Sequence, residues 1–180
     1  TFRAWNLKFL HSDVAAGKNK LYNLLKVYAL LLDSELGYCQ GMNMVAAVIL
    51  INVPNEVLAC QIFTKLLEKD NLAQIYLPST PKLFEFARNL QKKIAETDEE
   101  LFQVFKNDDG PYLEIALAGP LMTLFSNIVP LSEATQILSC FILDGEPFLM
   151  DLFMSIFVKM KPEILKRAED GFELSTYLSK

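Results

Sequence analysis

The sequence has few of the residues that build metal sites and nucleophile sites. Its 180 residues include one histidine, His11, and three cysteines, Cys39, Cys60 and Cys140, whose spacing matches no zinc motif. We therefore expect no metal site. An odd cysteine set in a domain of this size also argues against disulfide bonds and favours a reducing compartment. A thiol nucleophile at Cys39 with His11 as its base is an alternative, but no other residue completes such a site.

Positive charge is also scarce. Lysine and arginine together number 17, against 22 aspartate and glutamate residues, which gives a net charge of −5. Binding to nucleic acid needs clustered cations that neutralise phosphates, so the composition argues against a nucleic-acid partner. In contrast, 52% of the residues are hydrophobic and only 22% are charged. A chain of this size and composition should bury roughly 70% of its unfolded surface, which is typical of one folded domain.

No apolar run is long enough to be a transmembrane helix. Residues 44–51 form an uninterrupted apolar run, but a bilayer needs roughly 20 apolar residues. The longer apolar stretch at 113–131 is broken by charged, glycine and proline residues. We expect both to be buried helices of a soluble, cytoplasmic protein. Since the sequence begins at Thr1 without methionine and no segment has the form of a signal peptide, we also expect a fragment that lacks the N-terminal portion of its domain.

No segment shows the alternation of polar and apolar residues that is typical of a strand. Residues 19–33 instead repeat leucine and tyrosine at the three-and-four spacing of one helical face, which should point inward. These residues are Leu21, Leu24, Leu25, Tyr28, Leu31 and Leu32. A second helix, from the Gln40 segment to about Asn52, is apolar on nearly every side and should lie at the centre of the fold. The next helix is predicted at 55–69, and a loop around Tyr76 is expected after it. The inward-facing candidates of this helix are Val57, Leu58, Cys60, Ile62, Phe63, Leu66 and Leu67.

Helical segments separated by glycine and proline continue to the end of the chain. Ser132, with polar neighbours, suggests a helix N-cap. Gly119-Pro120 suggests a kink, and Pro162 suggests that one helix stops and a last one begins. The intervening helices are predicted at 81–96, 98–106, 112–125, 132–143 and 148–161. We therefore predict that residues 1–180 form a single all-α domain of roughly eight to ten helices.

The segment 38–43, with the sequence Y-C-Q-G-M-N, lies in a short break between two apolar helices. It places Gln40 at a helix start, where a partner can reach the side chain. The glutamine amide carries both an acceptor oxygen and a donor nitrogen, so it can hold a water molecule and a backbone group at once. In phosphoryl transfer, such a group orients the attacking water. The alternative interpretation of Gln40 is a polar cap or a surface amide.

The segment 21–28, with the sequence L-Y-N-L-L-K-V-Y, and the segment 37–43 together resemble the core of the TBC domain, a family of GTPase-activating proteins for Rab GTPases. In this family, the Y-x-Q element that Tyr38 and Gln40 match is the glutamine finger. The resemblance covers nearly the whole chain and is strongest at 17–47. The later family blocks follow in the expected order, as G-P-Y-L at 110–113, T-L-F-S at 123–126 and D-G-E at 144–146.

The resemblance implies a mechanism in which the protein supplies an arginine and a glutamine to the GTPase. The arginine neutralises charge between the β- and γ-phosphates, and Gln40 takes over the water-positioning role of the GTPase's own glutamine. Such an arginine commonly contributes roughly 10³ to 10⁵ in rate, about 4 to 7 kcal/mol. GTP and Mg²⁺ arrive on the partner, so no cofactor of the protein's own is expected. Tyr38, Gly41 and Asn43 are expected to shape the loop or touch the partner; the alternatives are a core anchor at Tyr38 and a helix cap at Asn43.

The arginine finger has two registers. The family pattern is I-x-x-D-x-x-R-T-F, and this chain begins T-F-R-A-W. In the preferred register Arg3 is the finger, 37 positions before Gln40 and close to the family's interval. In the other register Thr1 and Phe2 match the T-F of the pattern, and the finger is the residue before Thr1.

Two functions of different classes follow from the resemblance. The first is activation of GTP hydrolysis by a Rab, which implies a role in vesicle trafficking, in the cytoplasm or peripheral to endomembranes. The second is a catalytically inactive module that binds a Rab or another partner, because Gly119-Pro120 and Ser139-Cys140 stand where many relatives carry tryptophan. A helical scaffold with no GTPase partner is a third alternative.

Overall fold

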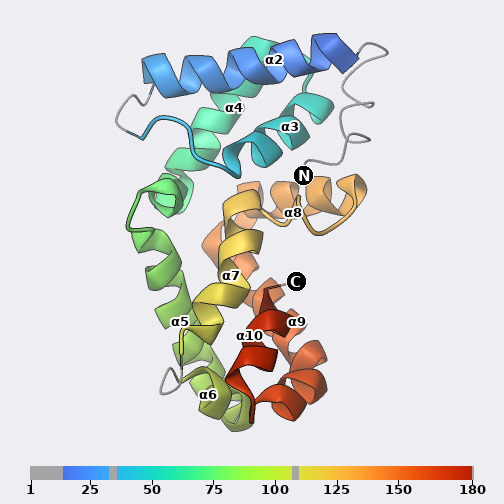
Figure 1. Ribbon diagram of the computed structural model, residues 1–180. Coiled ribbons are helices and arrows are strands. Elements are labelled where there is room, and N and C mark those ends of the chain that lie inside the picture. Colours follow the sequence, from blue (N-terminus) through green and yellow to red (C-terminus); the bar gives the residue numbers. More distant parts are fainter. Residues whose placement is uncertain (1–13, 33–35, 107–109, 180) are drawn as a thin grey trace.

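The computed structural model describes residues 14–32, 36–106 and 110–179, and every regular element in these ranges is a helix (Figure 1). Nine α-helices, one π-helical segment and one 3₁₀-helix occur there, and no strand. The all-α class and the expected number of helices are therefore confirmed. In chain order the elements are α2 (Val14–Val27), η1 (Tyr28–Leu32), α3 (Met42–Asn52), α4 (Glu56–Glu68), η2 (Lys69–Tyr76), α5 (Pro81–Thr97), α6 (Glu99–Phe105), α7 (Tyr112–Thr123), α8 (Leu131–Asp144), α9 (Glu146–Arg167) and α10 (Gly171–Leu178).

The helices form an elongated bundle. Figure 1 shows α2 lying across one end with α3 and α4 beside it, while α5, α6, α9 and α10 form the other end and α7 runs between them. Helix α3 packs against α2, α4, α7 and α8, and its residues 45–50 are all buried. The prediction of a central helix that is apolar on all sides is confirmed. Within the described ranges, no helix combines the length and the apolar character needed to cross a membrane.

Aromatic rings fill the core between α5, α6, α9 and the turn that follows α7. The Phe153 ring centroid lies 5.6 Å from that of Phe86 and 5.0 Å from that of Phe125. One turn further along α9, the Phe157 ring lies 6.1 Å from Phe153 and 5.1 Å from Phe105. Tilted and edge-on ring pairs contribute about 0.5–1.5 kcal/mol each beyond the area they bury. The cluster therefore holds α9 against the helices that precede it.

Ion pairs add to this attachment of α9. Lys82 Nζ lies 2.6 Å from Glu146 Oε2, and the Lys82 side chain is buried. Burial acts to lower the pKa of Lys82, but hydrogen bonds to Glu146 and Glu85 and the charges of both carboxylates more than offset it, so the pKa is raised. The Glu146 N–H donates to Asp70 Oδ2 (2.8 Å). Near the other end of α9, Lys161 Nζ lies 2.8 Å from Asp98 Oδ1. The start and the end of α9 are thus both fixed by charged groups.

The predicted end of a helix at Pro162 is wrong, because α9 continues through this proline to Arg167. Proline has no N–H, so the carbonyl of Val158 loses its helical donor. Both residues are exposed, and water can replace the lost hydrogen bond. The ion pair of Lys161 with Asp98 also holds this turn in place. The cost of the proline is therefore small enough for the helix to continue.

Two further predictions from local pattern are wrong. Ser132 is not an N-cap, because α8 begins at Leu131 and the Ser132 hydroxyl donates to the Glu133 carboxylate (2.6 Å). In α4, Val57 is 69% exposed and Leu58 is 48% exposed, although both are predicted to face inward. The buried stripe of this amphipathic helix repeats at the three-and-four spacing from Ala59 onward, so Val57 and Leu58 lie on its other faces. The residues of α4 that are buried are Ala59, Phe63, Leu66 and Leu67.

Two segments also differ from prediction in their local geometry. The helix expected at 19–33 is α2 followed by the π-helical η1. Leu31, expected on the inward face, is exposed, because the wider π turn changes which residues face the core. Tyr76, expected in a loop, is instead the last residue of η2 and is buried.

Candidate functional site

The segment that carries Gln40 joins η1 to α3 and turns at two glycines. Gly37 has a φ of +66° and Gly41 a φ of +108°, values that residues with a side chain rarely adopt. Gly41 is the N-cap of α3, and its carbonyl accepts a hydrogen bond from Met44 N–H (2.9 Å). Gln40 immediately precedes this turn and is exposed. The backbone freedom of the glycines therefore lets the chain turn into α3 and leaves Gln40 at the surface.

Asn43, in the first turn of α3, links the two sides of Gln40. Its Oδ1 accepts one hydrogen bond from Gly41 N–H (3.2 Å) and one from the Tyr38 hydroxyl (3.3 Å). The first bond resembles half of a capping box, in which a helical side chain reaches back to the N-cap amide. Partial burial, followed by a contribution from Cys39, raises the pKa of Tyr38, so its hydroxyl remains a donor at neutral pH. One side chain thus holds the residues before and after Gln40.

Met42 anchors the same segment in the core. Its side chain is fully buried, and its sulfur accepts a hydrogen bond from Cys39 N–H (3.3 Å). The Met42 N–H donates back to the Cys39 carbonyl (3.3 Å). Cys39 itself is half-buried and packs against the core. Although its neighbours are held in this way, the Gln40 side chain makes no hydrogen bond with any residue that the structure describes.

The turn at Gly41 rests on the C-terminal end of α7. A Cβ atom added at Gly41 would lie 2.7 Å from the Met122 carbonyl oxygen, which is closer than a side chain allows. Met122 directly precedes the T-L-F-S block at 123–126. In this block, Leu124 and Phe125 have φ values of +44° and +63°, so the helix ends sharply. Two motifs that are distant in the sequence therefore meet beneath Gln40.

The structure describes four of the five residues that the sequence predicts for the site, and it brings them together. Gln40 is exposed, Tyr38 is 55% exposed and Asn43 is half-buried. The alternative of a core anchor at Tyr38 is therefore wrong. Gly41 is buried, so it can affect a partner through the shape of the loop but hardly by contact. Arg3 lies outside the described residues.

The described ranges hold no group of three or more histidine, cysteine, aspartate and glutamate side chains that could bind a metal ion. Cys39, Cys60 and Cys140 are all free thiols. His11, the base in the alternative of a nucleophilic Cys39, lies outside the described residues.

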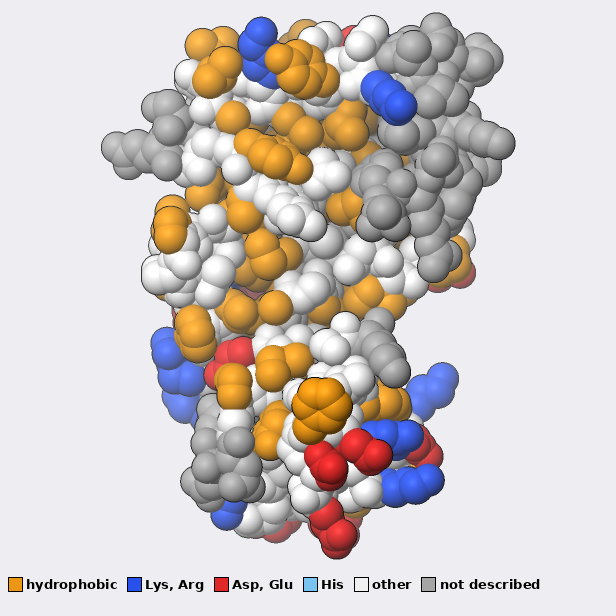
Figure 2. Space-filling model, in the orientation of Figure 1, with side chains coloured by type: hydrophobic (Ala, Val, Ile, Leu, Met, Phe, Trp, Pro, Cys, Tyr) orange, Lys and Arg blue, Asp and Glu red, His pale blue; other side chains and the backbone are white. Residues whose placement is uncertain are grey.

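The face around the loop carries few charges. Figure 2 shows apolar and uncharged side chains over α3 and α7, whereas most charged side chains in this view gather over α5, α6 and α10. Tyr38, two residues before Gln40, is a large aromatic side chain with high exposure. The core of a protein–protein interface is depleted in charged residues and enriched in aromatic ones. This face therefore suits a protein partner.

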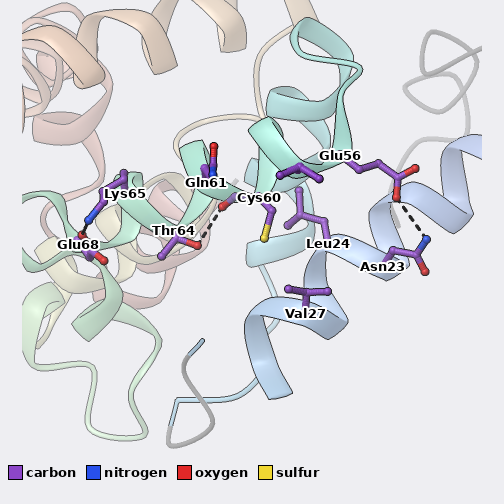
Figure 3. A pocket seen from close by; sticks show the side chains of 10 residues that line it. Asn23, Leu24, Val27, Glu56, Cys60, Gln61, Thr64, Lys65 and Glu68 are labelled. Carbon is purple, nitrogen blue, oxygen red and sulfur yellow. Dashed lines mark hydrogen bonds and ion pairs between the residues drawn. The ribbon is translucent and has the colours of Figure 1, made fainter. Parts of the chain in front are cut away.

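A groove of about 710 Å³ lies elsewhere, between α2 and α4 (Figure 3). Its lining includes Leu24, Val27 and the outward-facing Val57. A hydrogen bond from the Asn23 amide to the Glu56 carboxylate (3.3 Å) lies beside it, at the end shown on the right of Figure 3. All of its lining residues belong to α2 and α4, so the groove is distinct from the Gln40 loop.

The prediction from sequence does not include two residues that support the site, Met122 and Tyr76. Met122 lies beneath Gly41, and the Tyr76 hydroxyl donates a hydrogen bond to the Met122 carbonyl (2.8 Å). The position of Met122 beside the T-L-F-S block is a signal that could have identified it. No local signal marks Tyr76, because only tertiary packing brings it to the loop.

Comparisons with known proteins agree on one family. Residues 1–165 match the model of the Rab-GTPase-TBC domain. The chain is 27% identical to "Rab GTPase-activating protein eat-17" of Caenorhabditis elegans, over 88% of this chain and 18% of that protein. It is 26% identical to the human "Ecotropic viral integration site 5 protein homolog" (91% and 20%) and 32% identical to "GTPase-activating protein GYP5" of Eremothecium gossypii (77% and 16%). The chain thus spans a fifth or less of the length of these relatives.

Proposed function

This chain belongs to the Rab-GTPase-TBC domain family, and we propose that it accelerates GTP hydrolysis by a Rab-family small GTPase. The observation that carries the proposal is the state of Gln40. Its side chain is exposed and makes no hydrogen bond with the described residues, while the backbone on both sides of it is fixed by Asn43 and Met42. A glutamine that only capped the helix would use its side chain locally. This glutamine is available to a partner.

The proposed role of Gln40 is to orient the attacking water in the active site of the GTPase. Its amide oxygen would accept a hydrogen bond from the water, and its amide nitrogen would donate to a neighbouring acceptor. The water oxygen bonds to the γ-phosphorus while the bond from that phosphorus to the β–γ bridging oxygen breaks, which yields GDP and inorganic phosphate. GTP and Mg²⁺ are supplied by the GTPase. A loop that is already fixed loses less conformational entropy on binding, so more of its binding energy is available to orient the water.

Arg3 is the proposed arginine finger, 37 positions before Gln40. Its guanidinium would neutralise charge that develops between the β- and γ-phosphates. In the alternative register, the residue before Thr1 has this role. Tyr38 and Asn43 would contribute to the surface that receives the GTPase, because exposed aromatic side chains are common anchors at interfaces.

Single-turnover GTP hydrolysis, measured across a panel of Rab GTPases, tests the proposal. We expect Gln40→Ala to reduce the stimulated rate roughly 10²-fold on every Rab that responds, because a preorganised polar group is lost from the transition state. Gln136→Ala is the matched control, since Gln136 is also an exposed glutamine but lies on α8. Full stimulation by Gln40→Ala would show that this residue is not the glutamine finger. Arg3→Ala, compared in a longer form that includes the preceding residues, decides between the two registers.

A catalytically inactive, Rab-binding module is the second candidate. It is favoured by the replacement of tryptophan, common in the family, with Gly119-Pro120 and Ser139-Cys140. This function would be supported if one Rab bound the longer form tightly in its GTP state but no Rab in the panel was stimulated. Stimulation of any Rab that depends on Gln40 excludes it.

A further inference from the structure

The carbonyl of Met122 is not part of the regular hydrogen-bond pattern of its own helix. It lies in the last turn of α7, where helical carbonyls lose their partners. In a continuing helix, Ser126 N–H would donate to it, but this amide donates to the Thr123 carbonyl instead (3.0 Å). The cause is Leu124, whose left-handed backbone (φ +44°, ψ +51°) ends the helix. The Met122 oxygen is therefore available to a donor from another element.

Tyr76 supplies that donor. It ends η2, which packs against α7, and its hydroxyl lies 2.8 Å from the Met122 oxygen. The Tyr76 side chain is only 5% exposed. Burial, followed by interactions with Cys39 and Tyr28, raises the pKa of Tyr76 well above its usual value. The phenol therefore stays protonated and keeps donating throughout the neutral pH range.

The same Met122 oxygen is the atom against which Gly41 packs. A Cβ at Gly41 would meet it at 2.7 Å, so the backbone after Gln40 lies directly on this carbonyl. A peptide carbonyl that lacks a partner can change its direction by rotation of the peptide plane, especially at a frayed helix end. The hydrogen bond from Tyr76 opposes this rotation. The orientation of the Met122 carbonyl, on which Gly41 packs, thus depends on the buried phenol of Tyr76 in η2.

We propose that Tyr76 is a positioning residue for Gln40. Through the Met122 carbonyl it fixes the place of Gly41, and so the direction in which Gln40 extends toward a partner. The inference rests on the proposed role of Gln40 and extends it to a residue that touches neither the GTPase nor the nucleotide. Tyr76 acts on the geometry of the loop and contributes nothing to the binding surface itself.

A double-mutant cycle with Tyr76→Phe and Gln40→Ala tests the proposal. The rate of single-turnover GTP hydrolysis by a responsive Rab is measured against the concentration of this protein. We expect Tyr76→Phe to lower the maximal rate about tenfold while the half-saturating concentration stays within about twofold, because the loop is misdirected but the surface is intact. In the Gln40→Ala background, we expect Tyr76→Phe to have no further effect.

Tyr112→Phe is the matched control. Tyr112 is also a buried tyrosine, but it lies at the opposite end of α7, which packs against α10. We expect it to leave the maximal rate unchanged even if it lowers the unfolding temperature as much as Tyr76→Phe does. Equal losses of rate from Tyr76→Phe in the wild-type and Gln40→Ala backgrounds would indicate a merely structural role and overturn the inference. If Gln40→Ala abolishes stimulation but Tyr76→Phe does not change it, the inference fails and the proposed function stands.

Hydrogen exchange gives a readout that needs no GTPase. We expect Tyr76→Phe to speed exchange of the backbone amides at 41–43 at least about fivefold, since their support is loosened, and to leave the amides of α10 unchanged. Tyr112→Phe should speed exchange of the amides of α10 and leave the amides at 41–43 unchanged. Unchanged exchange at 41–43 in folded Tyr76→Phe overturns the inference even if Gln40→Ala leaves too little rate for the cycle to be measured.

Discussion

The loop before α3 and the two ends of α9 are stabilised by different kinds of contact. At the loop, a carbonyl supports Gly41, an amide oxygen accepts from Gly41 and Tyr38, and a thioether accepts from Cys39. All of these groups are uncharged. At the start and the end of α9, the contacts are the ion pairs of Lys82 with Glu146 and of Lys161 with Asp98.

The difference suggests that neutral hydrogen bonds fix the geometry of the loop, whereas ion pairs attach α9 to the rest of the domain. We call this the division between geometry and attachment. Neutral hydrogen bonds to backbone groups have directional requirements and do not change with pH in the neutral range, so they suit a loop whose shape must be constant. Ion pairs tolerate more variation in angle and hold whole helices together, at a cost in desolvation. If this division is correct, the activity and the stability of the domain can be impaired separately.

The largest effect is expected from Gly41→Ala. Its φ of +108° and the 2.7 Å approach to Met122 both exclude a side chain. We expect a loss of about 3 kcal/mol in the free energy of unfolding and, since the loop must move, a fall of at least about 100-fold in GTPase stimulation. Chemical denaturation and single-turnover hydrolysis measure the two effects.

Gly37→Ala provides the control for this substitution. Gly37 also has a positive φ, +66°, but no atom of the described residues lies within 4 Å of an added Cβ. Only the cost of a left-handed backbone remains, about 1 kcal/mol, and we expect stimulation to fall much less. Equal losses of stimulation from the two variants would mean that the contact with Met122 does not set the position of Gln40.

The next effect is expected at α9, from Glu146→Gln. Among the described residues, the buried Lys82 ammonium then keeps one carboxylate partner, Glu85, 3.4 Å away. We expect a loss of about 2 kcal/mol in the free energy of unfolding, below the cost for a fully buried pair because Glu146 is partly exposed. Stimulation of the GTPase, measured well below the unfolding temperature, should stay within about twofold of wild type, because the loop itself is untouched.

Glu163→Gln is the control on the same helix. Glu163 pairs with Arg167 one turn away, at the surface, and we expect almost no change in stability. The division between geometry and attachment would be contradicted if Glu146→Gln reduced stimulation as strongly as it reduced stability.

The order of the helices and the position of Gln40 could be predicted because both depend on local pattern. The apolar periodicity of α2 and α4 and the glycines around Gln40 act over a few residues. The errors arise where tertiary surroundings override the local pattern. From the sequence alone Pro162 is predicted to end a helix, but its exposed position and the ion pair of Lys161 let α9 continue. The apolar side chain of Val57 predicts a core position, but in α4 it is exposed and lines the groove beside α2.

The support of the site could not be predicted for a related reason. Tyr76 and Met122 are separated by 46 positions, and their hydrogen bond requires η2 to pack against α7. The sharp end of α7 at Leu124 is equally hidden, because leucine is a good helix former and rarely adopts a positive φ. Periodicity identifies which face of a helix is buried. It does not indicate which carbonyl at a helix end will meet a distant loop.

The smallest effect, and the one that depends on pH, is expected from Asp98→Asn. Asp98 caps α6 by accepting from Leu101 N–H (3.2 Å), and asparagine can keep this cap while it loses the charge. The hydrogen bond from Lys161 lowers the pKa of Asp98 in the folded protein. A carboxyl group with a lowered pKa stabilises the fold above its unfolded-state value of about 4, and this stabilisation is lost as the pH falls through the folded-state value.

The unfolding temperature of Asp98→Asn should therefore lie below that of wild type at about pH 7, and the difference should shrink as the pH falls toward about 3. Since both groups of the pair are partly exposed, the difference at neutral pH should be smaller than that caused by Glu146→Gln. Stimulation of the GTPase at neutral pH should match wild type. A difference in unfolding temperature that stays constant with pH would show that Asp98 acts as a cap alone, and that its charge contributes nothing to the attachment of α9.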